Sequence, residues 1–584
     1  MNKEWSLEVL YKGFHDEKYK EDKVALQTLT EELINFSEGI NREANEEATL
    51  LKAVDYLEQF QLLRTRLSYY VALRQSVNTS DSETVNEMNA IEKQLSLSSK
   101  PMAVINKFIA GIANLESYHN QYPKLKEYEY LLSEIKKEAK HLLSDDVEDV
   151  IAKLNISAGS AWGSMQSFLT STLEVEYRDN IITFPEVRNK AHSEDMEVRR
   201  DAFAAELKSL EKIKDAVSFS LNNIKTQVNT ICELRGYKTA LEMTLAQAKM
   251  KKETLEAMLE AIREALPSFH KYLKHKAKLM GHEKGLPWYD LFAPIGETTT
   301  KFTIEESKDY LLKHFKGFAK DLADMVEEAY DEEWIDFFPR KGKVGGAFCE
   351  NMPFVKQSRI LTNFTGSLSD VVTLAHELGH AYHGLNIQEH LPLNVDYSMP
   401  VAETASTFNE AIIMEAAIRE SEGREKIALI ESQLQDVTQI ICDIYSRYLF
   451  ETAVFERCKT GFLFADELKE IMLEAQKTAY GEGLDHDYLH PYMWVLKGHY
   501  YSEHLSFYNF PYAFGGLFAR GLYEKYKTEG DDFIPKYRAL LNATTVMSVE
   551  DAAKQAEINL EDPQFWRTSL KTIEALIDQF VTLA

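Results

Sequence analysis

The chain has 584 residues, of which 45% are hydrophobic and 27% charged, as in an ordinary globular protein. Its 66 basic and 93 acidic residues give a net charge of −27, which argues against nucleic acid or a membrane surface as partner, because phosphate contacts need clustered lysine and arginine. No apolar run approaches the roughly 20 residues that span a bilayer, and no secretory signal is recognisable. The four cysteines form no CxxC pair, so we expect a reduced, cytoplasmic protein.

Glycine and proline are scarce, with 25 and 14 residues, and this favours long helices. Apolar residues at three- and four-residue spacing predict helix over 21–76, and the polar stretch 77–83 predicts a break. A short linker is expected at 96–101 and further helix at 126–153. The small residues of 157–165 predict a loop.

The next stretch of the chain contains the first strand signal. Alternation and β-branched residues predict a hairpin over 174–184, with Asp179 and Asn180 at its turn. Long amphipathic helices are expected over 185–282.

A second group of strands is predicted after a helix that begins near residue 303. Thr303 and Glu306 have the spacing of a capping box and indicate a helix start. The segments 342–353 and 358–366 are glycine-rich or β-prone and predict short strands, after which the pattern is helical to the end. The sequence therefore predicts a mostly α fold with one small sheet just before the segment described next.

That segment contains an HExxH motif at residues 376–380. Two histidines four residues apart lie on one face of a helix, so the imidazoles of His376 and His380 can bind one Zn²⁺ at about 2.0–2.1 Å. Glu377 lies about 100° round the helix, where it can reach a metal-bound water rather than the metal. The motif predicts a catalytic zinc site with Glu377 as general base.

A catalytic zinc usually has three protein ligands, so a third is expected downstream. The metzincin pattern, which supplies a third histidine, would need glycine at 383 and histidine at 386. The sequence has His383 and Asn386 there, so that pattern is absent. Glu403 could instead reach the metal, or could be a charge that the helix dipole favours in a first turn. Glu410, seven residues later, could orient a ligand histidine. A structural role fits His383, since a fourth ligand would close the open position.

The chain resembles the oligoendopeptidase F family, whose members are bacterial relatives of thimet oligopeptidase. The residues that carry the resemblance are TNFTGSLSDVVTLAHELGHAYH (362–383), DYSMPVAETASTFNE (396–410), LPWYDLFAP (286–294), RKGKVGGAFC (340–349) and WSLEVLY near the start. The resemblance implies that Glu403 is the third zinc ligand. It also implies two helical lobes around a deep channel that admits unstructured peptides, with the small sheet beside the HExxH helix. We divide the chain into an N-terminal helical lobe, 1–195, and a catalytic domain, 196–584.

The family also implies that a histidine and one or more tyrosines from GHYYSEHLSFYNFPYAFGG (498–516) lie beside the scissile carbonyl. The candidates for donating a hydrogen bond to the oxyanion are His499, His504, Tyr508 and Tyr512. The alternative is that these side chains form an aromatic core cluster whose polar groups are already hydrogen-bonded. The strand at 359–364 is expected to align the peptide backbone.

The predicted function is that of a metalloendopeptidase with one zinc ion per chain, acting on oligopeptides. A dipeptidase or carboxypeptidase on the same site is an alternative, and so is a peptide-binding protein with a vestigial site. The sequence makes no prediction of oligomeric state.

Overall fold

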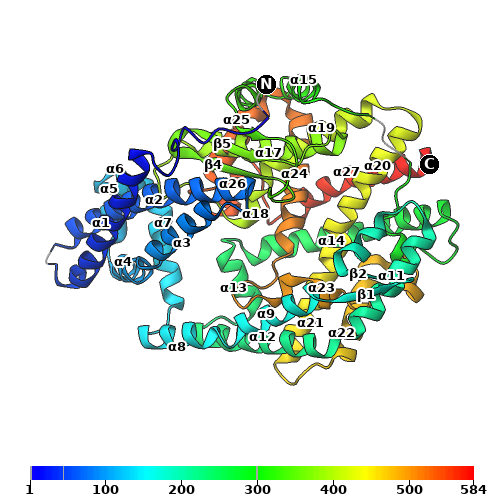
Figure 1. Cartoon of the computed structure of the whole chain (residues 1–584), viewed down its shortest axis with the longest axis horizontal. Helices are drawn as coiled ribbons and strands as arrows, with labels where there is room; N and C mark the ends of the chain where they lie inside the picture. Colours follow the sequence, from blue (N-terminus) through cyan, green and yellow to red (C-terminus); the bar gives the residue numbers. More distant parts are fainter. Residues whose placement is uncertain (1–2, 44, 297–299) are drawn as a thin grey trace.

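Helices make up most of this computed structural model, which describes residues 3–43, 45–296 and 300–584 (Figure 1). The prediction of a mostly α fold with small sheets is confirmed. Within these ranges, no helix combines the length and the apolar character of a membrane span.

The N-terminal part of the chain is a set of helices, several of which begin at a side-chain cap. Asp16 and Asn45 accept hydrogen bonds from the first turns of α1 and α2, so the predicted run 21–76 is two helices; Ala44, between them, lies outside the described residues. The helices of this part are α1 (Glu17–Gly39), α2 (Glu46–Val77), α3 (Ser82–Ser96), α4 (Ser99–Gly111), α5 (Leu115–Gln121), α6 (Pro123–Glu127), α7 (Glu129–Glu138), α8 (Asp145–Asn155) and α9 (Gly159–Ser171).

The prediction of a loop at 157–165 is wrong, because α9 begins at Gly159. The small residues there serve helix packing. A Cβ on Gly163 would lie 2.7 Å from the carbonyl oxygen of Tyr501. The predicted linker at 96–101 is also shorter than expected, since Pro101 already lies in the first turn of α4, where proline is tolerated.

The predicted hairpin is confirmed as β1 (Glu174–Tyr177) and β2 (Asn180–Thr183), which pair antiparallel. Its turn is one residue earlier than predicted. Asn180 pairs with Tyr177 in the ladder, so Arg178 and Asp179 make the turn, and Arg178 takes a left-handed φ of 52°.

The rest of the chain is again helical and contains the predicted capping box, in which Thr303 and Glu306 exchange hydrogen bonds. The helices are α10 (Phe184–Asn189), α11 (Met196–Glu211), α12 (Lys214–Arg235), α13 (Ala240–Gln247), α14 (Lys252–Leu279), α15 (Ile304–Phe315), α16 (Lys320–Asp331), α17 (Leu368–Ile387), α18 (Met399–Ala402), α19 (Thr404–Glu420), α20 (Gly423–Thr438), α21 (Ile444–Cys458), α22 (Ala465–Tyr480), α23 (Met493–Leu496), α24 (Phe510–Glu529), α25 (Phe533–Ala543), α26 (Val549–Lys554) and α27 (Pro563–Leu583).

A small sheet lies against α17, as predicted, and its strand order is β3-β5-β4 (Figure 1). β3 (Ile335–Asp336) pairs parallel with β5 (Gln357–Leu361), and β4 (Phe348–Met352) pairs antiparallel with β5. β5 is therefore enclosed on both sides and β4 is an edge strand. In the described part of the chain, no backbone hydrogen bond from another segment reaches the outer side of β4.

The buried apolar side chains form two cores. One contains residues from 5–132 together with Met352 and Leu361, and the larger one contains residues from 173–580. Ile360, next to Leu361 on β5, belongs to the larger core, so the sheet contributes to both. The division of the chain at residue 195 stays a prediction.

Candidate functional site

The helix α17 carries the HExxH residues and begins at a capping box. Ser367 Oγ accepts a hydrogen bond from the Asp370 amide at 3.1 Å, and Asp370 Oδ2 accepts one from the Ser367 amide at 2.9 Å. Leu374 is fully buried and marks the core-facing side of the helix. His376 and His380 lie on another face and are only partly buried.

A close approach of two helices brings the third predicted ligand to these histidines. Gly379, inside the motif, has no room for a Cβ, which would overlap the backbone of Ala405 on α19. The absence of a side chain lets α17 and α19 pack closely. Glu403 lies between α18 and α19 with φ −90° and ψ 9°, at the point where the two helices join.

The structure brings His376, His380 and Glu403 together. The Nε2 atoms of the histidines are 3.2 Å apart, and Glu403 Oε2 is 3.2 Å from His376 Nε2 and 3.4 Å from His380 Nε2. Ligand atoms about 2.0–2.1 Å from a tetrahedral zinc ion are roughly 3.3 Å from one another. The three atoms therefore fit a single zinc ion without rearrangement, and two imidazoles with a carboxylate are a donor set that zinc accepts.

Glu410 fixes the ring of His376, because its Oε1 lies 2.7 Å from His376 Nδ1 and leaves Nε2 facing the other two ligands. Burial lowers the pKa of His376, but hydrogen bonds to Glu403 and Glu410 outweigh burial and raise that pKa to about 10. Burial raises the pKa of Glu403, but hydrogen bonds from the two histidines outweigh it and hold that pKa well below its usual range. The electrostatics of the centre thus favour a cation.

Two further side chains support the centre and were missed in the sequence. Asn351 Nδ2 donates to the backbone oxygen of His380 at 3.0 Å, and Ser406 Oγ donates to Glu403 Oε2 at 2.8 Å. Ser406 could have been found by its three-residue spacing from Glu403. Asn351 reaches α17 from β4, a contact that no local pattern indicates.

Glu377 is buried, with 5% of its surface exposed. Burial raises the pKa of Glu377, although the neighbouring His376 and His380 oppose the increase. The charge of Glu377 in turn contributes to the raised pKa of the Cys349 thiol on β4, after burial, which is the largest cause. Gly384, two turns further along α17 on the same face as Glu377, has no room for a Cβ beside Asn351 of β4, so this face of α17 is turned toward the edge strand.

His499, Tyr508 and Tyr512 form one aromatic cluster. The ring of His499 is 4.7 Å from that of Tyr508, and the rings of Tyr508 and Tyr512 are 5.7 Å apart. Burial raises the pKa of Tyr512, and so do a hydrogen bond with Tyr508 and the negative charge of Glu403. The helix that carries Tyr512 contacts the centre, because a Cβ on Gly515 would lie 3.1 Å from that of Glu403.

Two other histidines of the sequence analysis lie elsewhere. The His504 imidazole is 3.3 Å from the Glu503 carboxylate with its side chain 79% exposed, and it does not join the aromatic cluster. His383 is fully buried and stacks on Tyr397 with ring centroids 4.1 Å apart. Burial lowers the pKa of His383 to about 3, so its imidazole is neutral, and its Nε2 lies 2.8 Å from the Thr544 hydroxyl.

With this geometry established, comparisons with known proteins are informative. A model of peptidase family M3 matches residues 190–572, and one described as oligopeptidase F matches residues 111–174. The chain is 24% identical over 591 residues to oligopeptidase PepF of Bacillus subtilis, covering 99% of this chain and 87% of the relative. It is 24% identical over 558 residues to an oligoendopeptidase F homologue of Borreliella burgdorferi, covering 92% and 90%. The crystal structure of oligoendopeptidase F from Enterococcus faecium aligns with a TM-score of 0.72 at 18% identity, over 97% of this chain and 99% of that one.

Proposed function

The chain belongs to peptidase family M3, and on that premise we propose that it is a zinc-dependent endopeptidase that hydrolyses internal bonds of short, unstructured oligopeptides. The observation that carries the proposal is the close grouping of His376, His380 and Glu403, whose ligand atoms are 3.2 to 3.4 Å apart. The names of the relatives, oligopeptidase and oligoendopeptidase, support a peptide substrate.

The three ligands would hold one zinc ion per chain. When bound, zinc supplies a Lewis acid that polarises a carbonyl group and makes water more acidic. His376 binds through Nε2 because Glu410 engages its Nδ1. Ser406 donates to Glu403 and keeps that carboxylate in place.

Glu377 is the proposed general base. It would take a proton from the attacking water and later pass that proton to the leaving amine. Its burial on the β4 side of α17 supports this role, because a desolvated carboxylate binds a proton more strongly than one in water.

Tyr512, Tyr508 and His499 are the proposed donors to the oxyanion. The raised pKa of Tyr512 means that its hydroxyl group keeps the proton that it would donate. Loss of one such donor typically costs about 10²–10³ in rate. His504 is left out of this proposal because it lies with Glu503, outside the aromatic cluster.

The edge strand β4 is the proposed alignment site for the substrate backbone. Residues 359–364 were predicted to have this role, but the prediction is wrong for β5, because this strand is paired with β3 and β4 on its two sides. Among the described residues nothing pairs with the outer side of β4, and an extended peptide can add to such an edge through main-chain hydrogen bonds. β4 lies against the face of α17 that carries Glu377 and Gly384, which would place an aligned peptide near the proposed base.

Three further parts of the proposal lie outside the site itself. The family resemblance implies a channel between two lobes that admits only unstructured peptides. The division into 1–195 and 196–584 and the cytoplasmic location are predictions from the sequence. The four cysteines are free thiols in the structure, which is compatible with a reducing compartment.

The test is mass spectrometry of a peptide library digested with and without a chelator. We expect chelator-sensitive cleavage inside peptides blocked at both ends, whereas an exopeptidase would spare them. Glu377→Gln should keep its zinc and lose several orders of magnitude in kcat, because the base is removed and the ligands are not. Turnover near the wild-type rate in that variant would exclude Glu377 as the base.

A further inference from the structure

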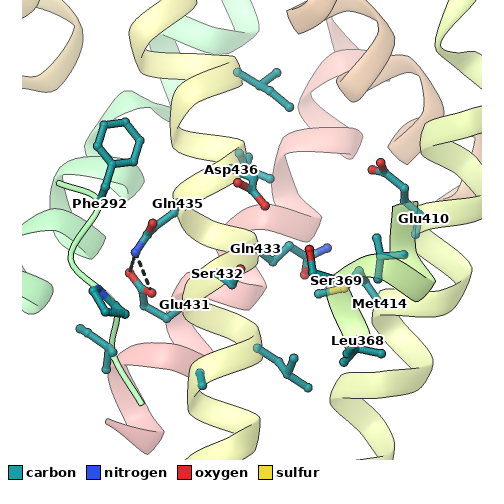
Figure 2. A pocket seen from close by; sticks show the side chains of 18 of the residues that line it. Phe292, Leu368, Ser369, Glu410, Met414, Glu431, Ser432, Gln433, Gln435 and Asp436 are labelled. Atoms are coloured by element: carbon teal, nitrogen blue, oxygen red, sulfur yellow. Dashed lines mark hydrogen bonds between the residues drawn. The ribbon is translucent and has the colours of Figure 1, made fainter. Parts of the chain in front are cut away.

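A cavity of about 380 Å³ opens beside the proposed metal centre, between α17, α19, α20 and α24 (Figure 2). It shares Glu410, which orients His376, with the centre. Val372 lies four residues before His376, and Thr407 lies four residues after Glu403. Residues four apart share a helix face, so the cavity continues along the two faces that carry the ligands.

Most of the wall of this cavity is apolar. Its volume lies at the lower end of the roughly 300–1,000 Å³ found for ligand pockets, so it suits one large side chain rather than a longer segment. The apolar side chains that line it include Phe292, Ile295, Leu368, Val372, Met414 and Val437.

The polar part of the wall holds an acidic side chain, Asp436, that is exposed to solvent at the mouth of the cavity and has no ion-pair partner in the described chain. Asp436, on α20, lies across the cavity from Glu410 and Met414 on α19 (Figure 2). In the described chain, its carboxylate makes no side-chain hydrogen bond and no ion pair. Glu431 also lines the cavity but is already engaged, since Lys276 Nζ lies 2.5 Å from its Oε1. Asp436 is thus the carboxylate of this wall that no side chain of the described chain engages.

One guanidinium group also lines the cavity, that of Arg520 on α24, and it has no carboxylate within ion-pair distance in the described chain. The wall therefore carries one guanidinium, the imidazole of His192 and three carboxylates, of which Glu431 is paired with Lys276 and Glu410 with His376. Desolvation raises the pKa of Asp436 to about 6; Glu410 and Glu431 add to the increase and Arg520 opposes it. Among these charges, the contributions of Glu410 and Glu431 at Asp436 exceed the opposing one of Arg520, and this balance favours a cationic ligand.

We propose that this cavity is a specificity subsite that binds a lysine or arginine side chain of the substrate, with the aliphatic stem along the apolar wall and the cationic end at Asp436. The inference rests on the proposed peptidase function. An acidic side chain could reach Arg520 only by coming close to the carboxylates of the same wall, so a basic side chain is the better match.

The experiment uses zinc-loaded enzyme and internally quenched peptides in which each position around the cleaved bond is varied in turn between lysine, norleucine and glutamate. The measured quantity is the ratio of kcat/KM for lysine to that for norleucine. At one position, Asp436→Asn should lower this ratio about tenfold, near the lower limit for a hydrogen bond to a charged group. Arg520→Gln should raise the same ratio, because it removes the opposing charge. Asp466→Asn, the same substitution at an exposed residue of α22, should leave it unchanged.

Two results would overturn the subsite. One is a ratio that neither Asp436→Asn nor Arg520→Gln changes at any position, although norleucine peptides are still cleaved. The other is a wild-type preference for glutamate that Arg520→Gln abolishes, which would make the cavity an anion site. If the zinc-loaded wild-type enzyme cleaved no peptide at all, the proposed function itself would fail. Zinc content and thermal unfolding of each variant show whether it is folded.

Discussion

A single carboxylate determines how the first histidine of the proposed centre is presented. Glu410 engages His376 Nδ1 at 2.7 Å and so selects the tautomer whose Nε2 can bind metal. Groups that orient a ligand in this way typically contribute about 10–100-fold in metal affinity.

We therefore expect Glu410→Ala to weaken zinc binding about 10–100-fold, and Glu410→Gln to weaken it less, because an amide oxygen can still accept a hydrogen bond. Zinc titration against a competing chelator measures the affinity. Glu415→Gln, at an exposed acid one and a half turns along α19, is the control. Unchanged affinity in Glu410→Ala would show that the contact does not orient the ligand.

The raised pKa of Asp436 predicts how substrate preference depends on pH. The groups that influence it are Glu410 on α19, Glu431 on its own helix and Arg520 on α24. Because this pKa is about 6, the carboxylate is charged above pH 6 and becomes neutral below it. The lysine-to-norleucine ratio should be constant at neutral pH and fall as the pH drops through 6. A ratio cancels the effects of pH that both substrates share.

The control for this prediction is Asp436→Asn, whose ratio should not vary with pH. A wild-type ratio that stayed flat between pH 7 and 5 would contradict the assigned role of the carboxylate.

Residue spacing predicts a site only where the backbone is regular. The positions of His376 and His380 follow from the helix period, and the seven-residue spacing indicated that Glu403 and Glu410 lie on one side. The segment that contains His499 and His504 has no such period. Tertiary contacts determine where the side chains of this segment lie. They place His499 with the tyrosines and His504 with Glu503.

At the scale of elements, the site depends on how closely α17 and α19 approach each other. Gly379→Ala would place a methyl group against the backbone of Ala405. We expect a loss of about 1–3 kcal/mol in the free energy of unfolding, the usual cost of overpacking, with weaker zinc binding because Glu403 moves away. Chemical denaturation and zinc titration measure the two effects.

The matched control is Gly461→Ala, where a Cβ meets no atom within 4 Å. Its stability and zinc affinity should remain close to those of the wild type. If Gly379→Ala and Gly461→Ala had the same stability and zinc affinity, α17 and α19 would be able to accommodate a methyl group between them.

Local sequence predicted which segments are strands but not how they are ordered. Both 342–353 and 358–366 were recognised, and β5 was expected to hold the peptide. Strand order depends on β3, a two-residue strand too short to detect, whose pairing encloses β5. The error at 157–165 has a similar origin, since glycine there permits packing against Tyr501 rather than chain reversal.

At the scale of the whole molecule, metal binding should stabilise one core more than the other. The three proposed ligands lie on α17 and at the α18–α19 junction, whose apolar side chains belong to the larger core. Zinc at 100 times its Kd would add about 2.7 kcal/mol to the stability of the folded state. We expect a chelator to lower the Tm, measured by circular dichroism. The Tm of His380→Ala should not change with zinc or chelator. If its Tm changed as much as that of the wild type, the stabilising metal would be bound at another site.

The sheet belongs to both cores, because Ile360 packs into one and Leu361 into the other. Any displacement of one core relative to the other would have to move β5, and with it β4, which pairs with β5 along its whole length. The proposed alignment site on the outer edge of β4 is therefore anchored in both cores at once.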